Sequence, residues 1–155
     1  MSRIALAVAT FGGAGFFPIA PGTAGSLAAL VPYAAVRWAG SPFADLGAIA
    51  LVMGAGTWAA TRSERLLGGK DPGPVVIDEV AGMLITLAFL PLSIAGVIAG
   101  FLIFRVCDVI KPWPAGPMER LPGGWGFMLD DAFAGLYAHA VVRLLAWGAP
   151  AWMLA

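Results

Sequence analysis

Charged residues, cysteine and histidine are all scarce in this chain of 155 residues. Only 12% of the residues are charged and 60% are hydrophobic, which lies well outside the range of soluble domains. The nine acidic and nine basic side chains cancel, so no basic surface is available to neutralise nucleic-acid phosphates. The composition therefore predicts an integral membrane protein without a nucleic-acid partner.

The single cysteine and the single histidine exclude several kinds of catalysis. Cys107 has no partner for an internal disulfide, and the residues after it, Asp-Val-Ile-Lys, do not form the phosphate loop of a cysteine phosphatase. A phosphatase that uses a histidine nucleophile needs more than one histidine, and only His139 is present. If the protein acts on phosphorus, the side chains present leave two possible nucleophiles: a metal-activated water and, less favourably, an aspartate.

Long apolar segments dominate the sequence. About 20 apolar residues are needed to cross about 30 Å of hydrocarbon as a helix. Five segments approach this length: 22–39, 43–61, 74–90, 93–110 and 131–154. Lipid requires backbone groups to pair within each segment, and the alternating pattern of barrel strands is absent. We predict an all-α, polytopic membrane bundle of about five helices in a single domain, 1–155, whose short third and fourth helices either cross fully or form a hairpin.

The loops between these segments are rich in glycine and proline and carry most of the basic residues. We expect three helix-breaking stretches, at 11–25, 68–74 and 111–126. With five crossings, one side of the membrane receives six basic residues: Arg3, Arg62, Arg65, Lys70, Lys111 and Arg120. Only Arg37 lies on the other side, so the positive-inside rule places the N-terminus in the cytoplasm.

Carboxylates are predicted to gather at the cytoplasmic ends of the last three helices. The set contains five acids: Asp78, Glu79, Asp108, Asp130 and Asp131. A carboxylate at membrane depth is costly unless it is paired or metal-bound, so we expect these side chains to face one another. Arg105 and Lys111 leave the group with a negative excess, which a hard divalent cation such as Mg²⁺ would relieve.

Structural roles compete with these functional interpretations. Arg105 and Asp108, spaced i and i+3, could form a packing ion pair, and Asp130 or Asp131 could cap a helix. Thr23 at the start of the first long segment could cap that helix or help to bind phosphate.

Other polar residues near the apolar segments could also serve either a structural or a functional role. Ser26 could likewise cap a helix or bind phosphate. We expect His139 and Arg143, one turn apart, to serve packing or an internal hydrogen bond.

Four motifs support a specific resemblance: PIAPGTAGSLAA at 18–29, VVIDEVAGM at 75–83, FRVCDVIKPWP at 104–114 and GGWGFMLDDAFAG at 123–135. Together they resemble the phosphatidylglycerophosphatase A family. The resemblance implies Mg²⁺-dependent hydrolysis of phosphatidylglycerophosphate, a phospholipid substrate, to phosphatidylglycerol and inorganic phosphate. It also implies a multi-pass protein of the bacterial inner membrane with its active site facing the cytoplasm.

The resemblance assigns roles to the matching residues. The implied metal ligands are Asp78, Glu79, Asp108 and Asp131, and these four with Asp130 form the implied catalytic set. Arg105 and Lys111 would hold the phosphate, and Thr23 and Ser26 would add substrate contacts.

Two other functions share some of these features. A small cation channel or transporter could be lined by the same carboxylates, but its polar residues would be spread along the membrane depth. A phosphotransferase acting on CDP-activated lipids would carry D-G-x-x-A-R followed by G-x-x-x-D-x-x-x-D, and neither run is present.

Overall fold

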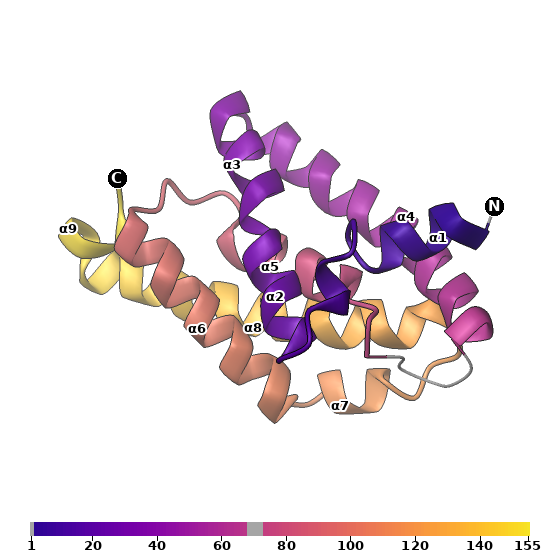
Figure 1. The fold of residues 1–155 in the computed structure, drawn as a ribbon. Helices are drawn as coiled ribbons and strands as arrows, with labels where there is room; N and C mark the ends of the chain where they lie inside the picture. Colours follow the sequence, from indigo (N-terminus) through magenta and orange to yellow (C-terminus); the bar gives the residue numbers. More distant parts are fainter. Residues whose placement is uncertain (1, 68–72) are drawn as a thin grey trace.

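The chain is helical throughout, as the sequence predicts (Figure 1). A computed structural model describes residues 2–67 and 73–155, and it contains no β-strand within those ranges. The elements in chain order are α1 (Ser2–Ala9), η1 (Ala14–Phe16), α2 (Pro21–Ala28), α3 (Leu30–Ala39), α4 (Pro42–Leu67), α5 (Ile77–Leu87), α6 (Ile94–Ile110), α7 (Ala115–Met118), α8 (Gly124–Gly148) and α9 (Pro150–Met153).

The first predicted segment, 22–39, is divided into two short helices. α2 ends at Ala28 and α3 begins at Leu30. Pro32 explains the break, because it has no N–H to donate to the Ala28 carbonyl and is tolerated only in the first turn of a helix. α3 then ends at Ala39, and its C-cap Gly40 has a φ of 62°, a left-handed conformation that favours glycine.

α4 is the longest helix and the clearest membrane candidate. Among the described residues, it alone is long and apolar enough to cross a membrane by length and composition, over Pro42–Arg65. Ser41 accepts a hydrogen bond from the Phe43 amide at 3.2 Å, which satisfies one of the free donors at the helix start. The predicted bundle of five crossing helices therefore stays a prediction, and only its helical class is confirmed.

The third predicted segment, 74–90, forms a helix much shorter than expected. α5 has 11 residues, about 16 Å at the usual rise per residue, too short to cross the hydrocarbon. Nine of these residues are buried, so α5 is the central helix of the molecule. α6 follows it, with Ser93 as its N-cap accepting from the Gly96 amide at 3.1 Å.

The fifth segment begins earlier than predicted. We expected a helix from residue 131 after a Gly-rich breaker, but α8 already begins at Gly124. The reason is tertiary packing. A Cβ at Gly124 would lie 2.2 Å from the Thr57 carbonyl oxygen, so glycine lets α8 approach α4 closely enough for its amide to reach Thr61 Oγ1 at 2.8 Å. Asp130 and Asp131 consequently lie two turns inside the helix, not at its entry.

α5 packs more extensively against α8 than any other pair of helices, and two glycines permit the contact. A Cβ at Gly135 would lie 2.6 Å from the Gly82 carbonyl oxygen, and a Cβ at Gly82 would meet the Phe104 ring at 2.4 Å and the Asp131 carbonyl at 2.9 Å. Thr86 Oγ1 adds hydrogen bonds to the carbonyls of Gly82 and Gly135, at 2.8 and 3.4 Å. Small residues thus bring the two backbones together, as is typical of membrane helix pairs.

The chain termini lie at opposite ends of the molecule (Figure 1). The N-terminus and the end of α4 share one end, whereas α9 and the C-terminus lie at the other. This arrangement is compatible with the predicted orientation, which nothing in the fold tests directly. Lys70, one of the six residues behind that prediction, lies outside the described residues.

The glycine contact between α5 and α8 yields a stability prediction. Gly82→Ala and Gly135→Ala each insert a methyl group against backbone or a buried ring, which costs about 1–3 kcal/mol and lowers the melting temperature of the detergent-solubilised protein. Gly47→Ala in α4 is the control, because a Cβ there meets nothing within 4 Å. Equal melting temperatures for all three variants would contradict the close contact.

Candidate functional site

Three of the predicted carboxylates converge between α5 and α8. One oxygen each of Asp78, Glu79 and Asp131 lies within 4.8 Å of the others. Asp78 and Glu79 occupy the first turn of α5. Asp131 belongs to α8, which packs against α5 at Gly82 and Gly135. The group is thus assembled by the close packing of two helices.

The burial of this group makes it a suitable cation site. Asp78 is 8% exposed and Asp131 is 4% exposed. Asp78 Oδ1, Glu79 Oε2 and Asp131 Oδ2 are buried without a hydrogen-bond partner among the described residues. Buried carboxylate oxygens without partners are strongly unfavourable, whereas oxygen ligands of this kind are those that Mg²⁺ prefers. The donor set therefore fits a hard divalent cation, whose identity the geometry leaves open.

The local sequence places the first two acids at a favourable position. The N-terminal turn of α5 carries unpaired N–H groups and the positive end of the helix dipole, which stabilise anions there. Just before the helix, the Val76 amide donates to the Ala9 carbonyl at 2.9 Å and fixes the chain at its entry. Asp78 and Glu79 therefore occupy the end of α5 that tolerates negative charge best.

The predicted phosphate-binding residues of α6 and α2 lie beside the acidic group. Arg105 pairs with Asp108 at 2.7 Å and donates to Ser26 Oγ at 3.3 Å. Ser26 in turn donates to the Gly22 carbonyl at 2.9 Å. A Cβ at Gly22 would lie 2.3 Å from Glu79 Oε1 and 3.3 Å from both terminal nitrogens of Arg105, so the first turn of α2 lies directly against both side chains.

Lys111 and Asp130 form a separate cluster. Lys111 Nζ lies 2.8 Å from Asp130 Oδ2 and 3.1 Å from Glu119 Oε2. The other oxygen of Asp130 accepts from the Asp131 amide at 2.9 Å. Both oxygens of Asp130 are therefore occupied, and this carboxylate is not among the three that converge.

The charge state of Lys111 follows from these contacts. Burial alone would lower the pKa of its ammonium group. The hydrogen bonds and charges of Asp130 and Glu119 outweigh burial and raise the pKa of Lys111 above its usual range. Lys111 consequently stays positive at neutral pH and ties the end of α6 to α8.

Asp108 and Thr23 are the remaining predicted site residues. Asp108 lies close to Asp131, although it is outside the group of three. Thr23 lies half-buried in the first turn of α2, and its side chain makes no hydrogen bond within residues 2–67 and 73–155. Sequence reasoning missed Gly22, for which the neighbouring PGT run was a signal, and Glu119, for which no local signal exists.

His139 and Arg143 form the internal hydrogen bonds that the sequence predicts. Arg143 Nε donates to His139 Nε2 at 3.1 Å, which leaves Nδ1 as the protonated nitrogen, 3.2 Å from the Thr86 carbonyl. These residues join α8 to α5 and take no part in the acidic group.

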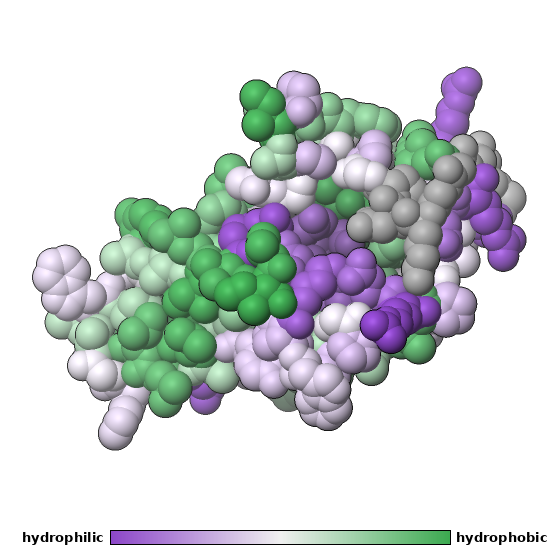
Figure 2. Space-filling model, turned by 90° about the horizontal axis from the view of Figure 1, so that it is seen from below, coloured by the Kyte–Doolittle hydropathy of each residue, from purple (hydrophilic) through white to green (hydrophobic). Residues whose placement is uncertain are grey.

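The surface distribution of side chains separates a polar face from an apolar end (Figure 2). Hydrophilic side chains gather in the middle of the face drawn there, and hydrophobic ones cover the end that holds α6 and α9. On α6, Ile94, Ile98 and Leu102 recur every four residues and are all more than half exposed. Such an exposed apolar stripe is typical of contact with lipid.

Comparison with known proteins assigns the chain to a family. The family model described as phosphatidylglycerophosphatase A matches residues 7–146, which include every residue of the site. The chain belongs to the phosphatidylglycerophosphatase A family. No solved structure matches the chain significantly.

Two of three similar curated proteins carry the name of this family. The phosphatidylglycerophosphatase A of Escherichia coli strain K12 is 37% identical over 86% of this chain and 78% of its own length. The phosphatidylglycerophosphatase A of Haemophilus influenzae is 35% identical over 92% and 86%. A protein of Bacteroides thetaiotaomicron, named putative phosphatidylinositol-3-phosphatase, is 36% identical over 94% and 96%.

The Lys111 cluster yields a prediction about stability. Lys111→Met leaves Asp130 buried without its partner, which costs about 1–3 kcal/mol and lowers the denaturation midpoint. Arg120→Met, an exposed change in the same connection, is expected to have little effect.

A double variant separates the ion pair from other effects of the substitution. Lys111→Met combined with Asp130→Asn is expected to lose less stability than the sum of the single variants. Strict additivity would show that the two side chains do not interact.

Proposed function

We propose that this protein hydrolyses the terminal phosphate monoester of phosphatidylglycerophosphate, giving phosphatidylglycerol and inorganic phosphate. The observation that carries the proposal is the buried group of Asp78, Glu79 and Asp131, with oxygens that lack partners, beside Arg105. Membership of the phosphatidylglycerophosphatase A family supports the substrate, and two relatives bear that name.

The Bacteroides relative raises a second candidate substrate. Its printed name refers to a 3-phosphate of phosphatidylinositol, which is also a phosphate monoester on a phospholipid headgroup. We favour phosphatidylglycerophosphate because the family model and two of the three relatives share that name. An assay with both lipids side by side decides between them.

Asp78, Glu79 and Asp131 would hold a Mg²⁺ ion, with Asp108 adjacent to them. Such an ion, when bound, neutralises negative charge on the phosphoryl oxygens and makes a water molecule more acidic. The carboxylates would coordinate the ion, and the burial of Asp78 and Asp131 would keep bulk water away from it. Arg105 and the first turn of α2, with Thr23 and Ser26, would orient the phosphate.

The reaction needs one bond made and one broken at phosphorus. The water oxygen bonds to phosphorus while the bond from phosphorus to the glycerol oxygen breaks, and the departing oxygen takes up a proton. A carboxylate of the site would accept the proton of the attacking water. Lys111 would contribute positive charge near the phosphate while it holds Asp130 in place.

We propose that the protein lies in a bacterial cytoplasmic membrane as a multi-pass chain, with the site facing the cytoplasm. α4 meets the requirements of a crossing helix, and the exposed apolar stripe of α6 suits a lipid environment. The distribution of basic residues supports the orientation. The channel alternative has less support, because the polar pair farther along α8 is engaged in internal hydrogen bonds: Arg143 donates to His139, and His139 contacts the Thr86 carbonyl.

Phosphate release tests the proposed function. Purified protein in detergent is expected to release phosphate from phosphatidylglycerophosphate with Mg²⁺ and to lose this activity in a chelator. Asp131→Asn and Asp108→Asn are each expected to lower the rate by at least about a hundredfold, since each removes a charge from the site.

A matched substitution controls for unspecific effects of losing a carboxylate. Glu64→Gln in α4 removes an acid outside the converging group and is expected to keep the wild-type rate. The proposal fails if the wild-type protein releases no phosphate in the presence of Mg²⁺, or if both aspartate variants keep near-normal rates.

Chemical labelling tests the topology separately. In a Cys107→Ala background, single cysteines at Ala39, before the turn between α3 and α4, and at Arg120, after α7, lie at exposed positions. They are expected to react with an impermeant maleimide from opposite sides of sealed vesicles. Labelling from the same side would mean that the number of crossings between them is even.

A further inference from the structure

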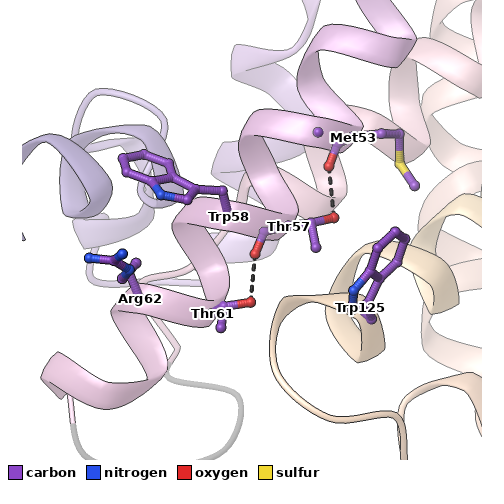
Figure 3. A pocket seen from close by; sticks show the side chains of 7 residues that line it. Met53, Thr57, Trp58, Thr61, Arg62 and Trp125 are labelled. Carbon is purple, nitrogen blue, oxygen red and sulfur yellow. Dashed lines mark hydrogen bonds between the residues drawn. The ribbon is translucent and has the colours of Figure 1, made fainter.

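A groove between α4 and α8 is not used by the proposed reaction. It has a volume of about 380 Å³ and is lined by Met53, Gly54, Thr57, Trp58, Thr61, Arg62 and Trp125. The six residues from α4 are spaced as one stripe along that helix, and Trp125 comes from the first turn of α8 (Figure 3). No lining residue belongs to the acidic group.

The groove changes from apolar to cationic along its length. Met53 and Arg62 are nine residues apart, which is about 13 Å along the helix axis. Met53 lies within the membrane candidate Pro42–Arg65, whereas Arg62 lies near its end. A phospholipid has the same gradient, from acyl chain to phosphate, over a similar distance.

The polar atoms of the groove leave Arg62 as the group that would select a ligand. Thr57 and Thr61 donate to the carbonyls of Met53 and Thr57 within α4 (Figure 3), and Thr61 also accepts from Gly124. Arg62 is exposed and forms no ion pair within residues 2–67 and 73–155. Within the part of the chain that the structure describes, its charge is therefore open to an anion that enters the groove.

Two indole rings flank the groove, and Trp58 lies one turn from Arg62 along α4. Trp58 is 41% exposed and Trp125 is 56% exposed, and Figure 3 shows them on α4 and α8 on either side of the threonines. Tryptophan concentrates at the headgroup level of membranes, where an apolar ring and a polar N–H are both satisfied. This position agrees with a headgroup at Arg62.

We propose that this groove binds an anionic phospholipid as a second lipid site, with the phosphate at Arg62 and an acyl chain running toward Met53 between Trp58 and Trp125. The inference rests on α4 lying in the membrane and does not depend on the phosphatase reaction. A zwitterionic lipid fits less well, because its own cation offsets the attraction to Arg62.

Tryptophan fluorescence tests the site in the full chain. A variant with Trp38, Trp113, Trp147 and Trp152 replaced by phenylalanine keeps only the two tryptophans of the groove. It is reconstituted into phosphatidylcholine vesicles that contain acyl-brominated phosphatidylglycerol or acyl-brominated phosphatidylcholine at equal mole fractions. We expect the anionic lipid to quench with a preference of about fivefold, the size typical of one basic residue at an anionic membrane surface.

Two arginine variants identify the charge that causes the preference for the anionic lipid. Arg62→Gln is expected to remove the preference, whereas Arg65→Gln, the same change one turn further along α4, is expected to keep it. Equal quenching by the two brominated lipids would overturn the proposal. So would an equal loss of preference in both variants, which would indicate general surface charge.

A second measurement covers the case in which the four phenylalanine replacements unfold the protein. Native mass spectrometry of chains with all six tryptophans counts the phosphatidylglycerol molecules retained from mixed micelles. Arg62→Gln is expected to retain one fewer than the wild type and Arg65→Gln. Identical counts for all three would overturn the proposal.

Discussion

The approach of α5 to α8 at Gly82 and Gly135 is the contact on which the rest of the structure depends. A single methyl group at either glycine would meet backbone or the Phe104 ring at less than 3 Å. Because the backbones come so close, Asp131 reaches the first turn of α5 and completes the acidic group. The hydrogen bonds of Thr86 and His139 lie along the same contact and hold the two helices in register.

A group of buried carboxylates is stable only if its surroundings compensate the charge. The α5 N-terminus provides a favourable dipole, and Arg105 provides a fixed cation that also contacts Ser26. Lys111 compensates Asp130 and joins the end of α6 to α8. One oxygen on each of Asp78, Glu79 and Asp131 has no compensating partner among the described residues. These three oxygens suit a divalent cation.

Local pattern predicts the helical class and, for α5 and α6, the helix ends at which the acids lie. It predicts neither the lengths of the helices nor the position of Asp130 and Asp131 inside α8. The hydrophobicity of 74–90 resembles a crossing segment, yet α5 is short because it is buried within the protein and its length is not set by the bilayer. Glycine propensity argues against a helix at 124–126, and close packing against Thr57 overrides it.

Long-range contacts explain the differences within the site. Asp130 and Asp131 are neighbours of the same type, and sequence alone treats them alike. In the helix they point in different directions, so that Asp131 joins α5 and Asp130 meets Lys111. Glu119 and the groove at Trp58 and Trp125 depend on segments far apart in the chain, which no local motif indicates.

We propose that the three converging carboxylates bind a divalent cation. Titration with Mn²⁺, followed by the electron paramagnetic resonance signal of the free ion, measures this directly and without substrate. We expect the wild-type protein in detergent to bind Mn²⁺ in competition with Mg²⁺, and Asp78→Asn to lose that binding while it stays folded by circular dichroism. Undiminished binding by Asp78→Asn, or no binding by the wild type, would contradict the account.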